Sequence, residues 1–389
     1  MRDEMGVGGG RLNVMDKMTC NDMIKRIAVA MIAVVALTAC GKKGDATGDG
    51  VATASDYDNV VYQPRYAQGF SIKCTGDSSI AVMVNNPWQG ADSISMLYRV
   101  AKPAERIVAM SSTFVAMLEE LGALDRVVGV SGLGFISSEA LHGMGEKVAD
   151  VGYDTNVDYE KIVMLNPDLV LLYGINGPNM IEGKLDELGI PYIYIGDYVE
   201  ESPLGKAEWV VAIGQLIGKR DEAISAFDGI ARRYNELKGR FSASSDKPKV
   251  MINTPYNDSW WMPSSTNYMP RLIADAGGDY IYKANTGNAS KAIDIEQAYM
   301  LVSEADIWIN PGQAFTKADV AAMAPRMTDT KVFTAGKVYN NNRRSTKGGG
   351  NDFYESGAMH PDIILKDLAK IFYPDSLEGY QPEYYHQLQ

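Results

Sequence analysis

The sequence has 389 residues, 46% of them hydrophobic and 22% charged, and its formal net charge is −12. This size and composition predict a globular protein with a substantial core and two domains. The acidic balance argues against nucleic acid as a partner, because binding phosphates requires a basic surface.

The N-terminus has the layout of a secretion signal. Lys25 and Arg26 precede an uncharged apolar run at residues 27–37. This run is too short for a transmembrane helix, which needs about 20 apolar residues. The following Leu37-Thr38-Ala39-Cys40-Gly41 resembles the bacterial lipobox, which implies cleavage before Cys40 and attachment of a lipid to it. The alternative is a buried apolar segment with a chance cysteine.

We therefore interpret residues 1–39 as a leader, with residues 1–22 as an upstream extension and Met23 as the start. Residues 40–56 have little to bury and are predicted to be a flexible tether. The remaining thiol, Cys74, is expected to be a small buried residue, with a reactive or intermolecularly paired thiol as the alternative.

Alternating apolar and polar residues predict a strand-rich cap in residues 57–100. Residues 70–75 and 80–85 alternate on either side of the turn residues Thr75-Gly76-Asp77, which is typical of a β-hairpin.

From residue 105 onward, short apolar runs alternate with helical patterns, as in a mostly parallel sheet covered on both faces. Strands are predicted at 107–109, 127–130, 169–173, 192–195, 250–253, 307–309, 332–334 and 338–339. Helices are predicted at 114–121, 159–165, 180–188, 268–276, 317–324 and 361–372.

A long helical stretch separates two such regions. Ser202 and Pro203 suit its first turn, a break is expected at Gly218-Lys219, and its end is expected near Phe241. The predicted organisation is an N-terminal lobe with its cap at 57–220, a connecting helix at 221–241 and a C-terminal lobe at 242–389.

The two lobes share a sequence pattern. Asp158-Tyr159-Glu160 followed by Met164-Leu165 recurs as Asp294-Ile295-Glu296 followed by Met300-Leu301, and an acidic turn and an apolar strand follow each. The letters alone could match by chance, but the matched order of elements favours a pseudo-repeat.

Several motifs resemble one family. Ala104-Glu105-Arg106-Ile107-Val108, Asn166-Pro167-Asp168-Leu169-Val170 and Ala276-Gly277-Gly278 occur in the order found in periplasmic binding proteins for ferric siderophores and cobalamin. The resemblance covers about residues 103–374 and leaves out the strand-rich cap. It implies an α/β fold with two Rossmann-like lobes joined by one long backbone helix, here with an added N-terminal β-rich segment.

The resemblance also implies partners. Such proteins deliver their ligand to an ABC permease and its ATPase, docking through one acidic residue per lobe. Glu182 is the candidate in lobe one. In lobe two the expected position falls near Thr266, which is not acidic, so Asp275 is the candidate there. We expect a lipid-anchored, extracytoplasmic monomer on the cell membrane.

Ligands of open α/β sheets lie beyond the carboxyl ends of the strands, and this rule nominates a set of binding residues. Aromatic faces and forked Arg donors would suit a bulky chelate with anionic oxygens. The candidates are Ser111, Ser112, Tyr173, Asn176, Trp260, Trp261, Arg343, Arg344, Phe353 and Tyr354. Alternatively, the aromatic residues belong to the core and the Arg pair is solvated. The Gly-rich segment 339–354 is interpreted as a mobile loop near the cleft, or else as an unrelated surface loop.

Enzyme signatures are missing from the sequence. His142, His360 and His386 are scattered, and we find neither a phosphate-binding loop nor a nucleophile elbow. We therefore predict a non-enzymatic binding protein with no resident metal and no covalent cofactor other than lipid. The expected ligand is a ferric siderophore, with cobalamin and haem as alternatives; a hydrolase or an adhesin is a distant alternative.

Overall fold

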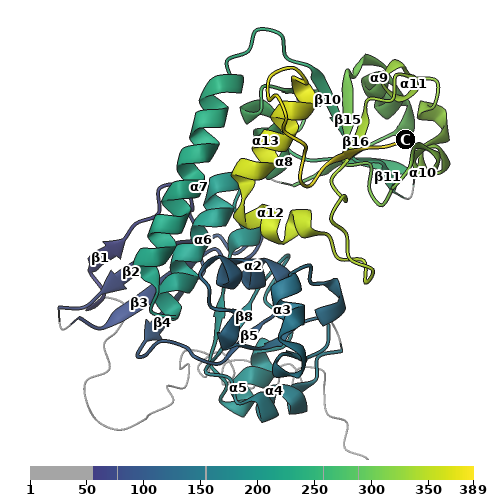
Figure 1. Ribbon diagram of the computed structural model, residues 1–389. Coiled ribbons are helices and arrows are strands. Elements are labelled where there is room, and N and C mark those ends of the chain that lie inside the picture. The colour runs from purple at the N-terminus through teal and green to yellow at the C-terminus, as the bar shows by residue number, and fades with distance from the viewer. Residues whose placement is uncertain (1–55, 77, 154–155, 257, 288) are drawn as a thin grey trace, which may run out of the picture. The chain divides into compact units, whose positions relative to one another are not determined.

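The computed structural model describes residues 56–389 apart from 77, 154–155, 257 and 288 (Figure 1). The predicted leader, nearly all of the tether and Cys40 lie outside the described residues. Cys74 is half-buried with a free thiol.

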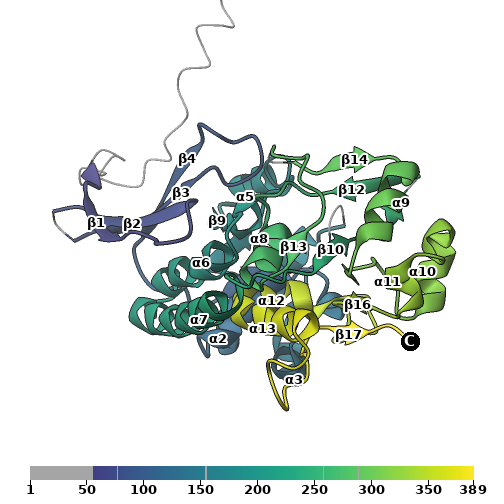
Figure 2. The ribbon, with the colours of Figure 1, turned by 90° about the horizontal axis from the view of Figure 1, so that it is seen from above.

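The strand-rich cap is a four-stranded antiparallel sheet in the order β1-β2-β3-β4. It confirms the predicted hairpin, because Ile72 pairs with Val82 across it. One face is buried against lobe one, where the ring of Phe70 lies 4.8 Å from that of Trp209. Figure 2 shows the sheet beside α6. The strands are β1 (Asn59–Tyr62), β2 (Phe70–Cys74), β3 (Ile80–Asn85) and β4 (Ser95–Val100).

Lobe one is built on a parallel sheet in the order β7-β6-β5-β8-β9. Its central strands are buried from end to end, as expected for a sheet covered on both faces. The strands are β5 (Ile107–Ala109), β6 (Val127–Val130), β7 (Ala149–Asp150), β8 (Leu169–Leu172) and β9 (Tyr192–Tyr194). The helices are α2 (Ser112–Glu120), α3 (Glu139–Gly143), α4 (Tyr159–Leu165) and α5 (Glu182–Leu188).

The long helical stretch is broken where the sequence predicts. Ser202 caps α6 (Pro203–Leu216), and Gly218, at φ +73°, separates it from α7 (Arg220–Phe241). The two helices pack against each other, and α7 leads into lobe two. Almost all of α6 is buried, whereas α7 buries one stripe that includes Phe227 and Tyr234.

Lobe two carries a second five-stranded sheet in the order β13-β10-β15-β16-β17, parallel except for β17. A small antiparallel sheet β11-β12-β14 stands beside it. The strands are β10 (Lys249–Ile252), β11 (Pro255–Tyr256), β12 (Ser259–Met262), β13 (Asp279–Tyr280), β14 (Lys291–Ile293), β15 (Ile307–Ile309), β16 (Val338–Asn340) and β17 (His386–Gln387). The helices are α8 (Tyr268–Asp275), α9 (Ile295–Glu304), α10 (Lys317–Met323), α11 (Lys331–Thr334), α12 (Ser356–Met359) and α13 (Pro361–Phe372).

Two predicted elements need correction. Residues 332–334, predicted to be extended, form the helical turn α11, which Gly336 ends at φ +69°. Residues 180–181 precede α5, because Asn179 forms a turn in which its side chain accepts a hydrogen bond from the backbone N–H of Ile181.

The pseudo-repeat has a structural counterpart. Asp158 caps α4 and Asp294 caps α9, each accepting a hydrogen bond from the backbone N–H three residues on. Asp168 and Asp306 then hold equivalent positions, because each carboxylate accepts a backbone N–H at the start of the neighbouring strand, from Arg106 and Lys249 respectively. The same local chemistry therefore joins helix and strand in both lobes.

The C-terminal helices tie the lobes together (Figure 1). Helix α12 packs on α2 and α6 of lobe one, and α13 packs on α7. Arg233 of α7 forms an ion pair with Asp362 of α13 (2.6 Å). The two sheets, the helices packed on them and the connecting helix thus confirm the predicted fold of two Rossmann-like lobes joined by one long helix.

Candidate functional site

The carboxyl end of β5 presents a pair of hydroxyls. Ser111 caps α2 by accepting the N–H of Thr113, and its Oγ lies 2.9 Å from the Thr113 hydroxyl. Ser112 is the first residue of the helix, and all three side chains are partly exposed. Both predicted serines therefore lie at the carboxyl edge of the lobe-one sheet, at a helix N-terminus that favours anionic groups.

Two hydrogen bonds of Asn179 fix the turn that follows β8. Asn179 donates from its side chain to the Tyr173 carbonyl (3.3 Å), and its own N–H donates to the Tyr194 hydroxyl (2.7 Å). Between these anchors the side chain of Asn176 is exposed and that of Tyr173 is half-buried. Both lie where a ligand could reach them.

The adjacent tryptophans Trp260 and Trp261 have opposite environments, because neighbouring strand residues point to opposite faces. Trp260 is fully buried against Trp308, with ring centroids 5.6 Å apart, and its indole N–H donates to the Ile252 carbonyl. It is a core residue, so its predicted ligand contact is wrong. Trp261 is 47% exposed and keeps the predicted role open.

The predicted arginine pair is already engaged within the chain. Arg343 donates to the Pro382 carbonyl. Arg344 forms ion pairs with Asp352 (2.8 Å) and Glu383. These contacts fasten the C-terminal segment, and they argue against the expectation that both guanidinium groups receive an anionic ligand.

Of the two aromatic residues that follow, only one is accessible. Phe353 is 2% exposed and packs edge-on against Tyr384 and Tyr385, so it is a core residue and not the predicted cleft aromatic. Tyr354 is 60% exposed. It lies on the segment after β16, and its hydroxyl accepts a hydrogen bond from the side chain of Asn341 (3.4 Å), the residue that directly follows β16.

Exposed aromatic side chains occur in the segments that follow the parallel strands of both lobes, and two of them lie on the short strands β11 and β12. Their exposed fractions lie between 43% and 70%, high for such large apolar groups. In lobe one the rings of Phe135 and Tyr153 lie 5.1 Å apart. The set, which we call the aromatic edge, is Phe135, Tyr153 and Tyr198 in lobe one, with Tyr256, Trp261, Phe315 and Tyr354 in lobe two.

The lobes touch on one side through the segment after β16. Glu355 accepts hydrogen bonds from the N–H groups of Ser137 (2.7 Å) and Ser138 (3.1 Å). Burial raises the pKa of Glu355 to about 7, and the nearby Asp352 acts in the same direction. The Thr346 hydroxyl donates to the Gly134 carbonyl (3.2 Å). The Gly-rich segment is therefore a contact between lobes.

A second set of contacts lies at the start of α6. Glu201 pairs with Arg271 of α8 (2.8 Å). The ammonium of Lys206 lies 5.7 Å from the ring centre of Tyr198 and 5.6 Å from that of Tyr268. One ring belongs to each lobe, so the partly buried cation bridges them.

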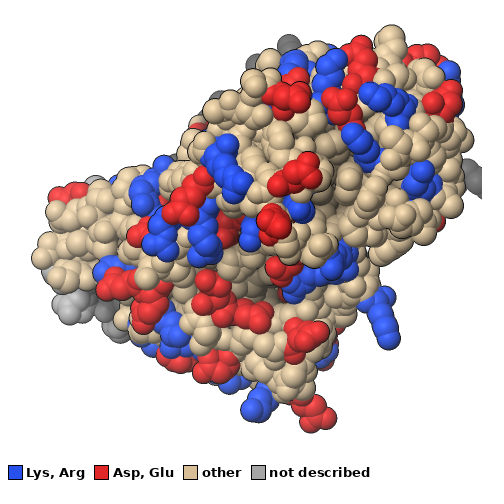
Figure 3. All heavy atoms as spheres, turned by 45° about the horizontal axis from the view of Figure 1, so that its top comes forward, with Lys and Arg blue, Asp and Glu red and all other residues tan. Residues whose placement is uncertain are grey.

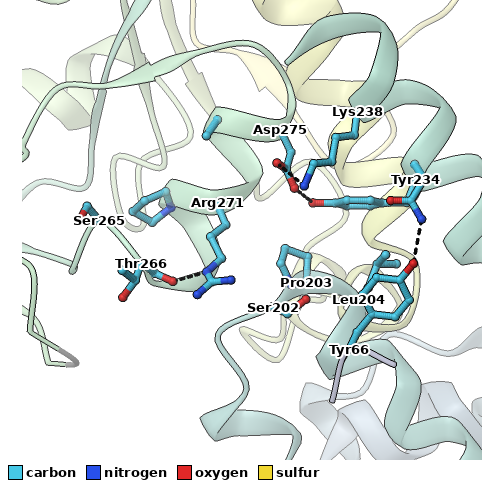
Figure 4. A pocket seen from close by; sticks show the side chains of 13 residues that line it. Tyr66, Ser202, Pro203, Leu204, Tyr234, Lys238, Ser265, Thr266, Arg271 and Asp275 are labelled. Atoms are coloured by element: carbon cyan, nitrogen blue, oxygen red, sulfur yellow. Dashed lines mark hydrogen bonds and ion pairs between the residues drawn. The ribbon is translucent and has the colours of Figure 1, made fainter. Parts of the chain in front are cut away.

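A hollow of about 340 Å³ lies between α6, α7 and α8 (Figure 4). Its polar side chains are largely paired with each other: Tyr234 donates to Asp275 (2.7 Å), and Asp275 also pairs with Lys238 (3.0 Å). Asn235 donates to the Tyr66 hydroxyl (3.0 Å). The hollow lies beside the connecting helix and does not contain the strand-end residues predicted to bind ligand.

The two candidate docking carboxylates differ. Asp275 is engaged by a tyrosine and a lysine in this hollow, so its charge is compensated and the structure argues against a docking role. Glu182 begins α5, is partly exposed and accepts a hydrogen bond from Tyr194 (2.6 Å). Burial, together with that hydrogen bond, holds the pKa of Tyr194 well above its usual range.

Within the described part of the chain, no group of three or more His, Cys, Asp or Glu side chains is arranged to hold a metal ion. None of the helices described there is long and apolar enough to cross a membrane.

The sequence matches the periplasmic binding protein family over residues 107–340, well over half of the chain. The chain belongs to the periplasmic binding protein family. This match begins at β5 and ends at β16, so it spans lobe one, the connecting helix and lobe two as far as residue 340, and it leaves out the N-terminal sheet and residues 341–389.

The chain is also similar to individual proteins and to a solved structure. An uncharacterized lipoprotein of Methanocaldococcus jannaschii is 28% identical over 295 residues, which is 73% of this chain and 68% of the relative. A vitamin B12-binding protein of Yersinia pestis is 26% identical over 192 residues, 49% of this chain and 64% of the relative. A periplasmic heme binding protein of Pseudomonas aeruginosa has the same fold, with a TM-score of 0.55 at 17% identity, over 74% of this chain and 98% of that protein.

Membership of this family makes the chain an extracytoplasmic solute-binding protein and not an enzyme.

Proposed function

We propose that this protein is the substrate-binding component of an ABC importer and captures a metal chelate between its two lobes. The observation that supports this most directly is the aromatic edge, because its seven exposed rings lie in the segments that follow the parallel strands of the two lobes, with Tyr256 and Trp261 on the short strands β11 and β12. In open α/β sheets this is where ligands bind. Exposed rings there suit a ligand with a large flat apolar surface.

Because Arg343 and Arg344 are already bound within the chain, we change the order of the expected ligands. A ferric siderophore with an anionic rim would call for available guanidinium groups, but Arg344 is bound to Asp352 and Glu383. Corrinoid and porphyrin chelates present mainly apolar faces. We therefore place cobalamin and haem ahead of a carboxylate-rich ferric siderophore, in line with the vitamin B12-binding and heme-binding proteins that the chain resembles.

The test is a titration of soluble protein (residues 44–389, which lack Cys40) with cobalamin, haem and a panel of ferric siderophores. We expect saturable one-to-one binding of one chelate class with Kd of about 1 µM or tighter, equivalent to about −8 kcal/mol. Trp261→Ala should weaken it about ten-fold or more. If no chelate binds, the proposed ligand class is wrong.

Membrane attachment and permease docking complete the proposal. Lipid on Cys40 would anchor the protein, and the 40–56 tether would let the monomeric binding unit reach the permease and its ATPase. Glu182 remains the candidate docking residue of lobe one. Glu182→Arg should impair uptake by cells without changing ligand affinity, whereas Glu187→Arg on the same helix should have little effect. Normal uptake with Glu182→Arg would reject this docking role.

The surface also fits a small-molecule carrier better than a nucleic-acid binder. On the face shown in Figure 3, acidic and basic side chains are interspersed and do not form a continuous basic stripe. The net charge of −12 also argues against binding to nucleic acid.

A further inference from the structure

The N-terminal sheet, which lies outside the family match, is fixed rigidly to lobe one. Glu208 on α6 is fully buried, and its carboxylate accepts hydrogen bonds from the N–H groups of Arg65, Tyr66 and Ala67 at 2.7–2.8 Å. Glu200 accepts two more, from the N–H groups of Gln68 and Gly69 (both 2.9 Å). Five consecutive backbone donors are thus satisfied by two buried carboxylates, which leaves the chain leading into β2 little freedom.

From this fixed base, the β3–β4 connection reaches the candidate ligand site. The N–H of Gln89 donates to the carbonyl of Ile175 (2.9 Å), in the turn after β8. The side chain of Trp88 packs edge-on against Tyr194, with ring centroids 5.1 Å apart. It also lies over Gly174, where an added Cβ would come within 2.9 Å of the Trp88 Cβ.

These contacts hold the turn that carries Tyr173 and Asn176. Tyr194 links Trp88 to the end of this turn, because its ring contacts Trp88 and its hydroxyl accepts the N–H of Asn179. Trp88 is only 8% exposed, so it acts on the turn and not on a ligand.

We propose that the β3–β4 connection, residues 86–94, is a positioning element that preorganises the 173–177 turn for ligand binding and thereby contributes to specificity. The proposal rests on the proposed function, because it assumes that the turn contacts the captured chelate. It gives a role to the added sheet: the sheet sets the shape of one side of the site. Trp88 and the Gln89 backbone are the positioning groups. Holding a loop in its bound conformation strengthens binding by lowering the ordering cost.

The turn at Gln89 allows a selective test. Ala91 N–H donates to the Trp88 carbonyl (3.2 Å), and Gly90 has φ +82° while Gln89 does not have a positive φ. This is a type II turn with Gln89 at its second position, where proline is favoured. Gln89→Pro should therefore keep the turn and remove only the N–H that donates to Ile175. Gln89→Ala keeps that N–H and serves as the matched control.

The experiment measures chelate affinity, thermal stability and hydrogen exchange of residues 174–179 in the full-length protein. Gln89→Pro should weaken binding by about five- to twenty-fold and speed exchange in this turn without ligand, with the melting temperature close to that of Gln89→Ala. Trp88→Leu should also weaken chelate binding and speed exchange in this turn. Equal affinity and equal exchange in Gln89→Pro and Gln89→Ala would overturn the proposal.

Chelate capture and positioning of the turn can be tested separately. If the wild-type protein binds no chelate, the proposed function fails, while exchange in the ligand-free protein still tests whether residues 86–94 position the turn. If the wild type binds and Gln89→Pro binds equally well with a faster-exchanging turn, the turn is positioned by the sheet but does not contribute to specificity, and the proposal is rejected.

Discussion

The carboxylate of Glu355 in lobe two accepts the backbone N–H of Ser137 in lobe one at 2.7 Å. It also accepts the N–H of Ser138, so a single buried side chain is shared between two backbone donors of the opposite lobe. Such a contact couples the ionisation of Glu355 to both the stability of the protein and the contact between its lobes.

The pH dependence of stability should carry the signature of Glu355. Burial raises its pKa from an ordinary value of 4.5 to about 7. The folded state therefore holds a proton that the unfolded state releases between these values, and the resulting stabilisation is present below pH 4.5 and lost as the pH rises to about 7. The free energy of unfolding should fall by up to about 3 kcal/mol over this window relative to Glu355→Gln. Denaturant titrations at several pH values measure it, and parallel profiles for the two proteins would contradict the assignment.

The two neighbouring tryptophans should separate stability from binding. Trp260→Ala should destabilise the protein by about 3–5 kcal/mol, because it empties a fully buried site. Trp261→Ala should change stability by less than about 0.5–1 kcal/mol and act on chelate affinity. Thermal unfolding and titration of both variants check this. Similar unfolding temperatures would show that Trp260 is not a core residue.

The buried carboxylate of Glu208 should anchor the N-terminal sheet. Glu208→Gln replaces an acceptor of three backbone N–H groups and of the Tyr62 hydroxyl with a group that is itself partly a donor. We expect destabilisation by about 2–4 kcal/mol, measured by denaturant unfolding. The control is Glu236→Gln on the exposed side of α7, which should be close to neutral. If the two variants are equally stable, the sheet is held by other contacts.

The close approach of the lobes at the Gly-rich segment should be sensitive to a single methyl group. A Cβ at Gly350 would lie 1.7 Å from the Phe135 carbonyl oxygen, so Gly350→Ala must push the segment away from lobe one. Gly134→Ala, on the other side of the same contact, meets nothing within 4 Å and is the matched control. Gly350→Ala should increase the distance between labels placed on the two lobes and weaken chelate binding. An unchanged distance would mean that this contact does not set the lobe arrangement.

The local patterns in the sequence predict most of the fold. The alternation in residues 70–85 gives the hairpin, and Ser202-Pro203 and Gly218 give the start of α6 and the break before α7. Residues 332–334 were predicted incorrectly because three apolar or β-branched residues fit a strand and a helical turn equally well. The short antiparallel sheet β11-β12-β14 and the terminal strand β17 depend on pairing between distant segments, which local patterns do not reveal.

The candidate site is harder to predict than the fold. The rule for strand ends nominates candidate loops, but it does not tell Trp260 from Trp261, since that depends on the register of β12. Arg344 looks available in the sequence because its partner Glu383 lies 39 residues further along the chain. Tyr153 was missed because β7, the strand before it, has only two residues.

The most direct test of the account is hydrogen exchange with and without a saturating chelate from the titration panel. Binding between the lobes predicts slower exchange on both sides of the site, in residues 131–138 and 173–179 of lobe one and in residues 253–262 and 341–354 of lobe two. Protection confined to the hollow beside α7, or to one lobe alone, would contradict capture of the ligand between the carboxyl edges of the two sheets.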